Sequence, residues 1–246
     1  MLNFHVITLF PDILENCFYQ SITGRASERK LISLNCVQLR DYAINDYGSV
    51  DDTLYGGGRG MLIRPEPVAD AFSALIDGWS EERIAQAKRL YLSPKGQTFN
   101  QSRAAKLAKY QDVILLCGHY EGVDYRVLEA LQFEEISIGD FILTGGEIPA
   151  ALIIDAVARL VPDVLPDQDA YTEESFHLNL LEEKQYTRPA QWGDLSVPDI
   201  LQSGDQAKIK NFRRASRLTE TLTKRPELLA QAELTAEDFS LLLNNL

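Results

Sequence analysis

The sequence predicts an α/β protein, with a mostly parallel β-sheet in the first two-thirds of the chain and a small helical domain after it. Short apolar runs alternate with amphipathic stretches over residues 1–160, which is typical of parallel strands joined by helices. Residues 161–174 are rich in proline and aspartate, and mainly helical signals follow them. We therefore expect one domain at 1–160, a flexible linker at 161–174 and a helical domain at 175–246.

The elements of the first domain are expected in alternation. Strands are expected at residues 4–9, 32–39, 89–92, 113–117 and 135–138, where short apolar or alternating runs occur. Helices are expected at residues 11–19, 65–76, 100–108, 124–131 and 148–160, and the first opens with a proline, which suits the first turn of a helix. The run Tyr-Gly-Gly-Gly-Arg-Gly at 55–60 predicts a loop, because so many glycines are costly inside a helix or strand.

The helical domain contains a basic helix. Asp205 is expected to cap a helix that runs to about residue 223, and shorter helices are expected at 226–231 and 235–244. Four basic side chains recur at i, i+3, i+4 and i+7 on the first helix and share one face: Lys210, Arg213, Arg214 and Arg217. Residues 205–225 carry seven basic and two acidic side chains, whereas the whole chain has a net charge of −12. This asymmetry indicates an anionic partner at the helix, and the alternative is an ordinary solvated face.

The composition excludes several classes of protein. With 246 residues, 45% hydrophobic and 24% charged, the chain is typical of a globular protein. No run approaches the roughly 20 apolar residues of a membrane helix, and no basic run opens a signal peptide. Three cysteines without a C-x-x-C pair argue against a disulfide framework or a structural zinc site, and suggest a reducing cytoplasm. The acidic balance argues against a protein that coats nucleic acid, and we expect no DNA partner.

Common nucleotide-binding and hydrolase motifs are absent from the sequence. It contains no G-x-x-x-x-G-K-[ST] phosphate loop, no G-x-S-x-G elbow and no H-E-x-x-H pair, and the glycine run at 56–60 does not fit G-x-G-x-x-G. His5, His119 and His177 lack metal-ligand spacing. A phosphate-binding hydrolase is therefore disfavoured, and the sequence identifies no metal ligands.

Three loops, at 91–96, 117–122 and 137–147, each follow an expected strand. Ligands bind at the carboxyl ends of strands in parallel sheets, so the three loops can converge on one site. Their glycines let backbone groups approach a ligand closely, and Tyr120 or Leu143 can cover the face of an adenine. The alternative is that the glycines only serve turns. The candidate cofactor-binding residues are Tyr91, Leu92, Ser93, Pro94, Gly118, Tyr120, Glu121, Gly122, Ser137, Ile138, Gly139, Asp140, Phe141, Ile142, Leu143, Gly145 and Gly146.

These loops resemble those of the bacterial tRNA (guanine-N1)-methyltransferases of the knotted SPOUT superfamily. The resemblance covers essentially the whole chain. It is carried by Leu9-Phe10-Pro11, Thr23-Gly24-Arg25-Ala26, Val50-Asp51-Asp52, residues 55–61, the three loops, residues 154–159, Tyr186-Thr187-Arg188-Pro189 and residues 225–229. It implies a trefoil knot that holds S-adenosylmethionine, a homodimer whose active sites use both subunits, and a product, 1-methylguanosine, at tRNA position 37. A magnesium ion is also implied, without its ligands.

The resemblance also implies roles for individual residues. Arg159 corresponds to the arginine that stabilises guanine O6, although an arginine at a helix end can simply bond the last carbonyls. Glu174 stands where the family has the aspartate of an Asp-Ser-Phe motif, its general base. Glutamate is one methylene longer than aspartate, which changes the position of the carboxylate, so Asp169 is an alternative base. The non-catalytic alternative is that Glu174 is simply a solvated acid of the linker. Arg59 and His119 also depart from the family, which commonly has proline and arginine there.

The proposed chemistry fits the charge pattern. The methyl donor is a sulfonium cation, which an acidic body does not repel, whereas the basic helix can contact the phosphates of tRNA. Guanine N1 must lose a proton before it attacks, so an acceptor for that proton and a cation at O6 are both useful. Two alternatives stay open: a related knotted methyltransferase that modifies another base or a ribose hydroxyl, and an RNA-binding protein without catalysis.

Overall fold

A five-stranded sheet forms the centre of the N-terminal part of the chain. The computed structural model describes residues 1–166 and 174–244, and the chain divides into two units, Met1–Pro166 and Asp167–Leu246. The strands of the first unit are β1 (Leu2–Thr8), β2 (Ile32–Gln38), β5 (Lys88–Thr98), β6 (Asp112–Leu116) and β7 (Glu134–Ser137), in the order β2-β1-β6-β5-β7. All four neighbouring pairs are parallel, which confirms the predicted parallel sheet.

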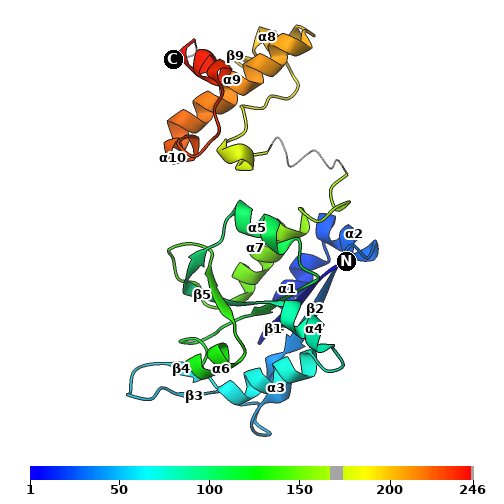
Figure 1. Ribbon diagram of the computed structural model, residues 1–246, viewed down its shortest axis with the longest axis vertical. Helices are drawn as coiled ribbons and strands as arrows, with labels where there is room; N and C mark the ends of the chain where they lie inside the picture. Colours follow the sequence, from blue (N-terminus) through cyan, green and yellow to red (C-terminus); the bar gives the residue numbers. More distant parts are fainter. Residues whose placement is uncertain (167–173, 245–246) are drawn as a thin grey trace. The chain divides into compact units, whose positions relative to one another are not determined.

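Helices cover both faces of this sheet (Figure 1). The helices α1 (Pro11–Phe18), α2 (Ser21–Glu28), α5 (Gln101–Leu107) and α7 (Glu147–Ala158) share one apolar core with one face of the strands. The helices α3 (Pro65–Leu75) and α6 (Tyr125–Ala130) pack on the other face, and α4 (Glu81–Gln86) precedes β5. Phe4 and Val6 point into the first core and Ile7 into the second, as expected for successive residues of a strand. Burial on both faces explains why the strands read as apolar runs.

The predicted glycine loop lies between two short strands that the sequence did not predict. These strands, β3 (Asp51–Thr53) and β4 (Met61–Ile63), form an antiparallel hairpin. The helices α2 and α4 were also missed. The hairpin reaches the sheet's carboxyl edge, because the backbone amide of Glu121 donates to the carbonyl of Met61 (3.0 Å).

Strand β5 runs six residues beyond the expected 89–92 and contains an excursion. Leu92 and Gln97 both pair with Ile136 of β7, so residues 93–96 leave the ladder and return to it. Gly96 permits the return, since a β-carbon there would lie 2.3 Å from the carbonyl carbon of Glu135. The excursion brings one of the three predicted loops to the edge where β6 and β7 end.

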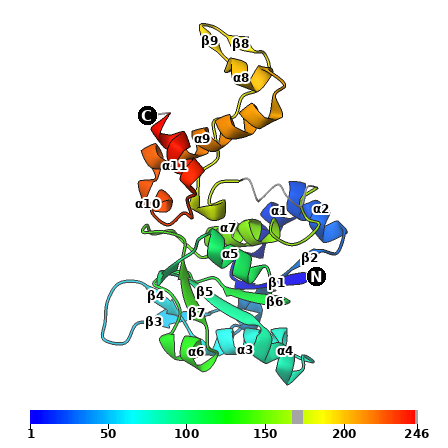
Figure 2. The same cartoon turned by 45° about the horizontal axis from the view of Figure 1, so that its top comes forward.

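The second unit is mainly helical, as expected, and its long helix follows the sequence prediction closely. Asp205 caps α9 (Gln206–Lys224), its side chain accepting from the Lys208 amide, and α10 (Pro226–Leu229) and α11 (Ala236–Leu243) follow. Leu180, Leu218 and Leu242 form the core. A short 3₁₀ turn (His177–Asn179), the hairpin of β8 (Gln191–Trp192) and β9 (Leu195–Ser196), and α8 (Asp199–Gln202) were not predicted. The hairpin and α8 lie at one end of α9, and α10 and α11 at the other (Figure 2).

The expected linker at 161–174 falls on both units. Its first part belongs to the first unit, where Val164 is buried and Arg29 Nη1 donates to the carbonyl of Asp163 (2.8 Å). Residues 167–173, including Asp169, lie outside the described residues. Among the helices that the structure describes, none has the length and apolar character needed to cross a membrane.

Candidate active site

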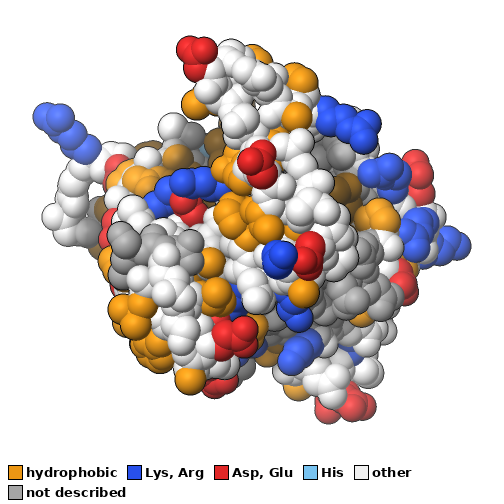
Figure 3. Space-filling view, turned by 90° about the horizontal axis from the view of Figure 1, so that it is seen from above, with side chains coloured by type: hydrophobic (Ala, Val, Ile, Leu, Met, Phe, Trp, Pro, Cys, Tyr) orange, Lys and Arg blue, Asp and Glu red, His pale blue; other side chains and the backbone are white. Residues whose placement is uncertain are grey.

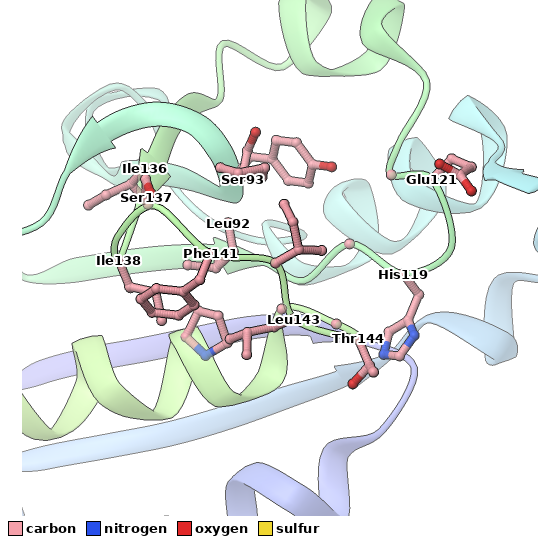
Figure 4. A pocket seen from close by; sticks show the side chains of 18 of the residues that line it. Leu92, Ser93, His119, Glu121, Ile136, Ser137, Ile138, Phe141, Leu143 and Thr144 are labelled. Carbon is pink, nitrogen blue, oxygen red and sulfur yellow. The ribbon is translucent and has the colours of Figure 1, made fainter.

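A cavity of about 280 Å³ opens where β5, β6 and β7 end. Three loops line it, and their labelled side chains surround it in Figure 4. The lining residues are Tyr91, Leu92, Ser93, Pro94, Gly118, His119, Tyr120, Glu121, Gly122, Ile136, Ser137, Ile138, Gly139, Phe141, Ile142, Leu143, Thr144, Gly145, Gly146 and Pro149. The three loops that the sequence singled out therefore converge, and all the predicted cofactor residues except Asp140 are among the lining residues.

Sequence reasoning missed four of the lining residues. Ile136 lies inside a strand rather than after it, and Pro149 lies in the first turn of α7. His119 and Thr144 belong to the singled-out loops but were not assigned to the cavity. Asp140, which was assigned, is exposed in the third loop and is not a lining residue.

Glycines allow the second and third loops to touch along their backbones. The Gly146 amide donates to the carbonyl of Gly118 (2.9 Å). A β-carbon on Gly146 would lie 2.7 Å from the Cys117 Cα, and one on Gly118 would lie 2.9 Å from the Tyr91 hydroxyl oxygen. Any larger residue would therefore separate the loops or fill the cavity between them. The glycines thus serve the packing of the loops on one another, whereas the approach of backbone groups to a ligand stays a prediction.

A buried carboxylate holds the base of the cavity together. Glu147, the first residue of α7, accepts a hydrogen bond from Thr8 Oγ1 at the end of β1 (2.7 Å). Its other oxygen lies 3.0 Å from His119 Nε2, and the ring of Phe10 packs against His119 with 4.8 Å between centroids. A negative charge at a helix N-terminus is favourable, so Glu147 also suits its place in α7.

The cavity wall combines apolar side chains with a few polar groups. Burial raises the pKa of Tyr91, so its hydroxyl stays protonated at neutral pH. Ser93 Oγ donates to Glu135 Oε1 (2.8 Å), and Ser137 Oγ accepts from the Gly139 amide (3.1 Å). Glu121 is an exposed carboxylate at the mouth. An apolar slot with backbone groups and a nearby acid suits a planar purine and a positively charged group.

The structure gives no comparable support for a metal ion. Among the described residues, no group of three or more His, Cys, Asp or Glu side chains is arranged to hold one. Residues 1–166 and 174–244 therefore identify no ligand set for the magnesium ion that the resemblance implies.

Arg159 is not part of the cavity in its own chain. It caps the carboxyl end of α7, where its backbone amide donates to the Asp155 carbonyl (3.3 Å), whereas Pro149 lines the cavity at the other end of the helix. Arg159 lies ten positions after Pro149, or about 15 Å further along the helix axis. The cavity and the Arg159 backbone therefore lie at opposite ends of α7 in the same chain.

Glu174, the other predicted catalytic residue, belongs to the second unit. Its backbone carbonyl lies 3.5 Å from Arg217 Nη2, which donates to it. Ser175 and Phe176 follow it as in the family motif, and the Arg225 guanidinium lies over the Phe176 ring at 6.0 Å. Phe176 and Leu178, two and four residues further along the chain than Glu174, are large exposed apolar side chains.

The four basic residues predicted to contact RNA differ in their surroundings. Arg214 forms a bidentate pair with Asp238 (2.7 and 2.9 Å), and Arg217 donates to the carbonyls of Leu181 and Glu174. Lys210 and Arg213 are exposed, and Arg213 lies 3.6 Å from Glu183. On the face drawn in Figure 3, Lys and Arg side chains are interspersed with Asp and Glu side chains. The basic face available to an anion is thus smaller than the helical spacing predicts.

A family model described as tRNA (Guanine-1)-methyltransferase TrmD matches residues 2–231. The chain belongs to this family. It is 46% identical to the tRNA (guanine-N(1)-)-methyltransferase of Alkaliphilus oremlandii over 234 residues. The matched residues make up 95% of this chain and 94% of that relative. It is 42% identical over 238 residues to the protein of that name from Staphylococcus carnosus, covering 97% and 95%. The resemblance inferred from the motifs and the assignment as a methyltransferase are therefore confirmed.

Membership of the tRNA (guanine-1)-methyltransferase family gives the cavity a chemical context. A methyltransferase of this kind implies S-adenosylmethionine as its methyl donor. The residues present suit that cofactor, since the cavity offers an apolar slot, tightly packed glycines and the carboxylate of Glu121, with no lysine or arginine among its lining residues.

Proposed function

We propose that this member of the family transfers the methyl group of S-adenosylmethionine to N1 of guanosine 37 of tRNA, next to the anticodon, in the cytoplasm. The products are 1-methylguanosine and S-adenosylhomocysteine. The observation that carries the proposal is the convergence of three glycine-containing loops on one cavity at the carboxyl edge of the sheet.

The cavity is proposed to bind the cofactor. Leu92, Ile138 and Leu143 enclose the adenine, and backbone groups of the second and third loops read its edge. Glu121, at the mouth, attracts the positive charge of the donor. When bound, the cofactor supplies an electrophilic methyl group on a sulfonium sulfur.

Glu174 and Arg159 are proposed to activate guanine. The Glu174 carboxylate accepts the N1 proton, and the ring nitrogen then forms its bond to the methyl carbon while the methyl–sulfur bond breaks and its electron pair stays on sulfur. Negative charge that develops on O6 is met by the Arg159 guanidinium, which remains charged throughout. Holding these groups in line supplies much of the rate.

The position of Arg159 supports an active site built from two subunits. Because α7 separates Arg159 from its own cavity, we propose that Arg159 serves the cavity of a partner subunit. Exposed apolar side chains provide a surface for a homodimer: Phe10, which precedes α1, Ile13 on α1, and Ile148 and Leu152 on α7. Pairing α7 with its copy would bring each Arg159 toward the other subunit's site.

We also propose that the loops form the trefoil knot of the SPOUT superfamily. Two features support it: the excursion at residues 93–96 that returns under Glu135 at Gly96, and the tight crossing of Gly146 with Cys117 and Gly118. Chain crossings this close are rare in ordinary sheets.

The proposed reaction is tested with labelled S-adenosylmethionine and two tRNA transcripts that carry guanosine or adenosine at position 37. We expect label only in the guanosine transcript, as 1-methylguanosine after digestion. Another methylated nucleoside would favour a related methyltransferase, and no label with retained tRNA binding would favour an RNA-binding protein without catalysis.

Mixed dimers test whether Arg159 acts across the interface. One subunit carries Arg159→Ala and the other Gly146→Val, which fills the cavity. If each site uses one subunit's cavity and the other's Arg159, the mixed dimer keeps one intact site and about half the wild-type activity. If both come from the same chain, every site carries one defect and the mixture stays inactive.

A further inference from the structure

A second, larger hollow lies entirely within the second unit. It has a volume of about 930 Å³ and is bounded by the extended segment before the β8–β9 hairpin, by α8 and by the first half of α9. Its lining residues are Glu183, Lys184, Gln185, Tyr186, Thr187, Arg188, Ala190, Val197, Leu201, Gln202, Gln206, Ile209, Phe212 and Arg213. We call it the C-terminal groove. It shares no lining residue with the cavity of the first unit.

We propose that the C-terminal groove binds the base of one unpaired nucleotide of the tRNA, other than the nucleotide that is methylated. This inference rests on the proposed function for its choice of tRNA as the ligand. It assigns a role to Tyr186 and Arg188, whose motif the methyl transfer does not use.

The groove offers aromatic rings to a base. Tyr186 is 46% exposed and Phe212 is half-buried, one on the extended segment and the other on α9. An exposed tyrosine ring at a hollow is suited to stacking on a base. Stacking accepts any base, because every base has an aromatic face. Ile209 and Leu201 add apolar surface to the lining.

The groove also offers cations to a phosphate. Arg188 is exposed, and Arg213 has 55% of its side chain exposed. The one acidic lining residue, Glu183, is only 15% exposed and lies 3.6 Å from Arg213, so its charge is largely compensated. The rim therefore favours an anion in spite of the acidic chain.

Side-chain amides supply hydrogen bonds for the edge of a base. Gln202 Nε2 donates to the Val197 carbonyl (3.1 Å), and Gln185 Nε2 donates to Glu182 Oε1 (3.0 Å). Both amides are thereby held in place, and each keeps a carbonyl oxygen that can accept from a base. Gln206, at the start of α9, adds a third amide.

These features together favour an unpaired nucleotide over other ligands. Bases in an RNA helix are stacked and their edges are hard to reach, whereas loop nucleotides can be splayed out onto protein rings. A protein partner would need a more apolar surface at the centre of the contact. Rings, guanidinium groups and amides in one hollow are instead the side chains that bind single-stranded RNA.

The test measures tRNA binding to the full-length chain across a range of salt concentrations. Tyr186→Ala is expected to raise the Kd for tRNA roughly 5- to 100-fold, as loss of one base stack does. Tyr186→Phe keeps the ring and should stay within about twofold of wild type. Arg188→Gln should reduce the slope of log Kd against log salt by about one, as loss of one phosphate contact does.

Trp192→Ala is the matched control. Trp192 is 76% exposed, belongs to the adjoining β8 strand and does not line the groove, so its removal should leave the Kd within about twofold of wild type. Circular dichroism and the affinity for S-adenosylmethionine should be unchanged in every variant. In methyl transfer, Tyr186→Ala should raise KM for tRNA and leave kcat within about twofold, because binding there is remote from the reacting atoms.

The outcomes separate this inference from the proposed function. The proposed role of the C-terminal groove would be overturned if Tyr186→Ala bound tRNA as tightly as the Trp192→Ala control and Arg188→Gln left the salt slope unchanged. Methyl transfer by the wild type would be unaffected by that result. Wild-type protein that binds tRNA through Tyr186 but makes no 1-methylguanosine would overturn the proposed function and leave the groove supported.

Discussion

His119 Nε2 lies 3.0 Å from Glu147 Oε2, so the second loop of the cavity is attached to the first turn of α7. The same carboxylate accepts from Thr8 Oγ1, which adds the end of β1. Glu147 is only 3% exposed and therefore depends on these partners to offset the loss of water. One buried side chain thus joins three segments that are distant in the sequence, next to the lining residues His119 and Gly146.

Glu147→Ala is expected to loosen this junction. The fully buried Thr8 hydroxyl would lose its acceptor, and His119 would lose its only carboxylate neighbour on α7, for a loss of about 1–3 kcal/mol in the free energy of unfolding. The affinity for S-adenosylmethionine should also fall. Urea denaturation and calorimetry measure the two effects, with Glu147→Gln expected to lie closer to wild type because it keeps an acceptor for Thr8. Exposed Glu129→Ala is the control, and an equal result for both alanine variants would contradict the assigned role.

Gly96→Ala tests the crossing of the first loop over β7. The added methyl group would lie 2.3 Å from the peptide group that joins Glu135 and Ile136, and backbone, unlike a flexible side chain, has little room to adjust. We expect a loss of about 1–3 kcal/mol or more in the free energy of unfolding, or failure to fold, as overpacking against backbone produces. Lys95→Ala, at the exposed neighbouring position, should be close to neutral. Wild-type stability of Gly96→Ala would show that residues 93–96 do not return to the sheet as described.

The sequence predicts the sheet and the cavity better than it predicts the connections between distant segments. Apolar runs identified all five strands of the sheet because burial on both faces leaves a clear signal. The continuation of β5 through Ser93 and Gly96 has no such signal, since pairing with β7 alone makes it a strand. Likewise, helical spacing placed Arg214 on a basic face, but its partner Asp238 lies 24 residues away and is brought to it only by the packing of α11 on α9.

Arg214 is paired with a buried carboxylate and Arg213 is exposed, so we expect these neighbouring arginines to have different functions. Arg214→Gln would leave Asp238, 5% exposed, without its cation, and we expect the second unit to lose about 1–3 kcal/mol of stability. Arg213→Gln removes an exposed charge and should leave stability within about 0.5 kcal/mol of wild type. It should instead lower the salt dependence of tRNA binding by about one charge. Thermal unfolding and filter binding of both variants decide the assignment, and the same pattern in the two would contradict it.

Asp112, at the amino end of β6 and away from the cavity, should determine how the free energy of unfolding changes in acid. Burial tends to raise the pKa of Asp112, but hydrogen bonds from Arg83, His5 and Asn3 outweigh it and lower the pKa from 3.8 to about 2. A carboxyl whose pKa is lower in the folded state contributes stability above its unfolded pKa and loses it as pH falls toward the folded pKa, so the loss should fall between about pH 4 and pH 2. Burial lowers the pKa of His5, which adds a loss of stability that begins nearer pH 6.5.

Urea unfolding between pH 7 and pH 2 should show about 2 kcal/mol less pH-dependent stability in Asp112→Asn than in wild type. Asp112→Asn should also be less stable at pH 7, because Arg83 and His5 lose their charged partner; a curve parallel to wild type below pH 4 would place the acid sensitivity elsewhere.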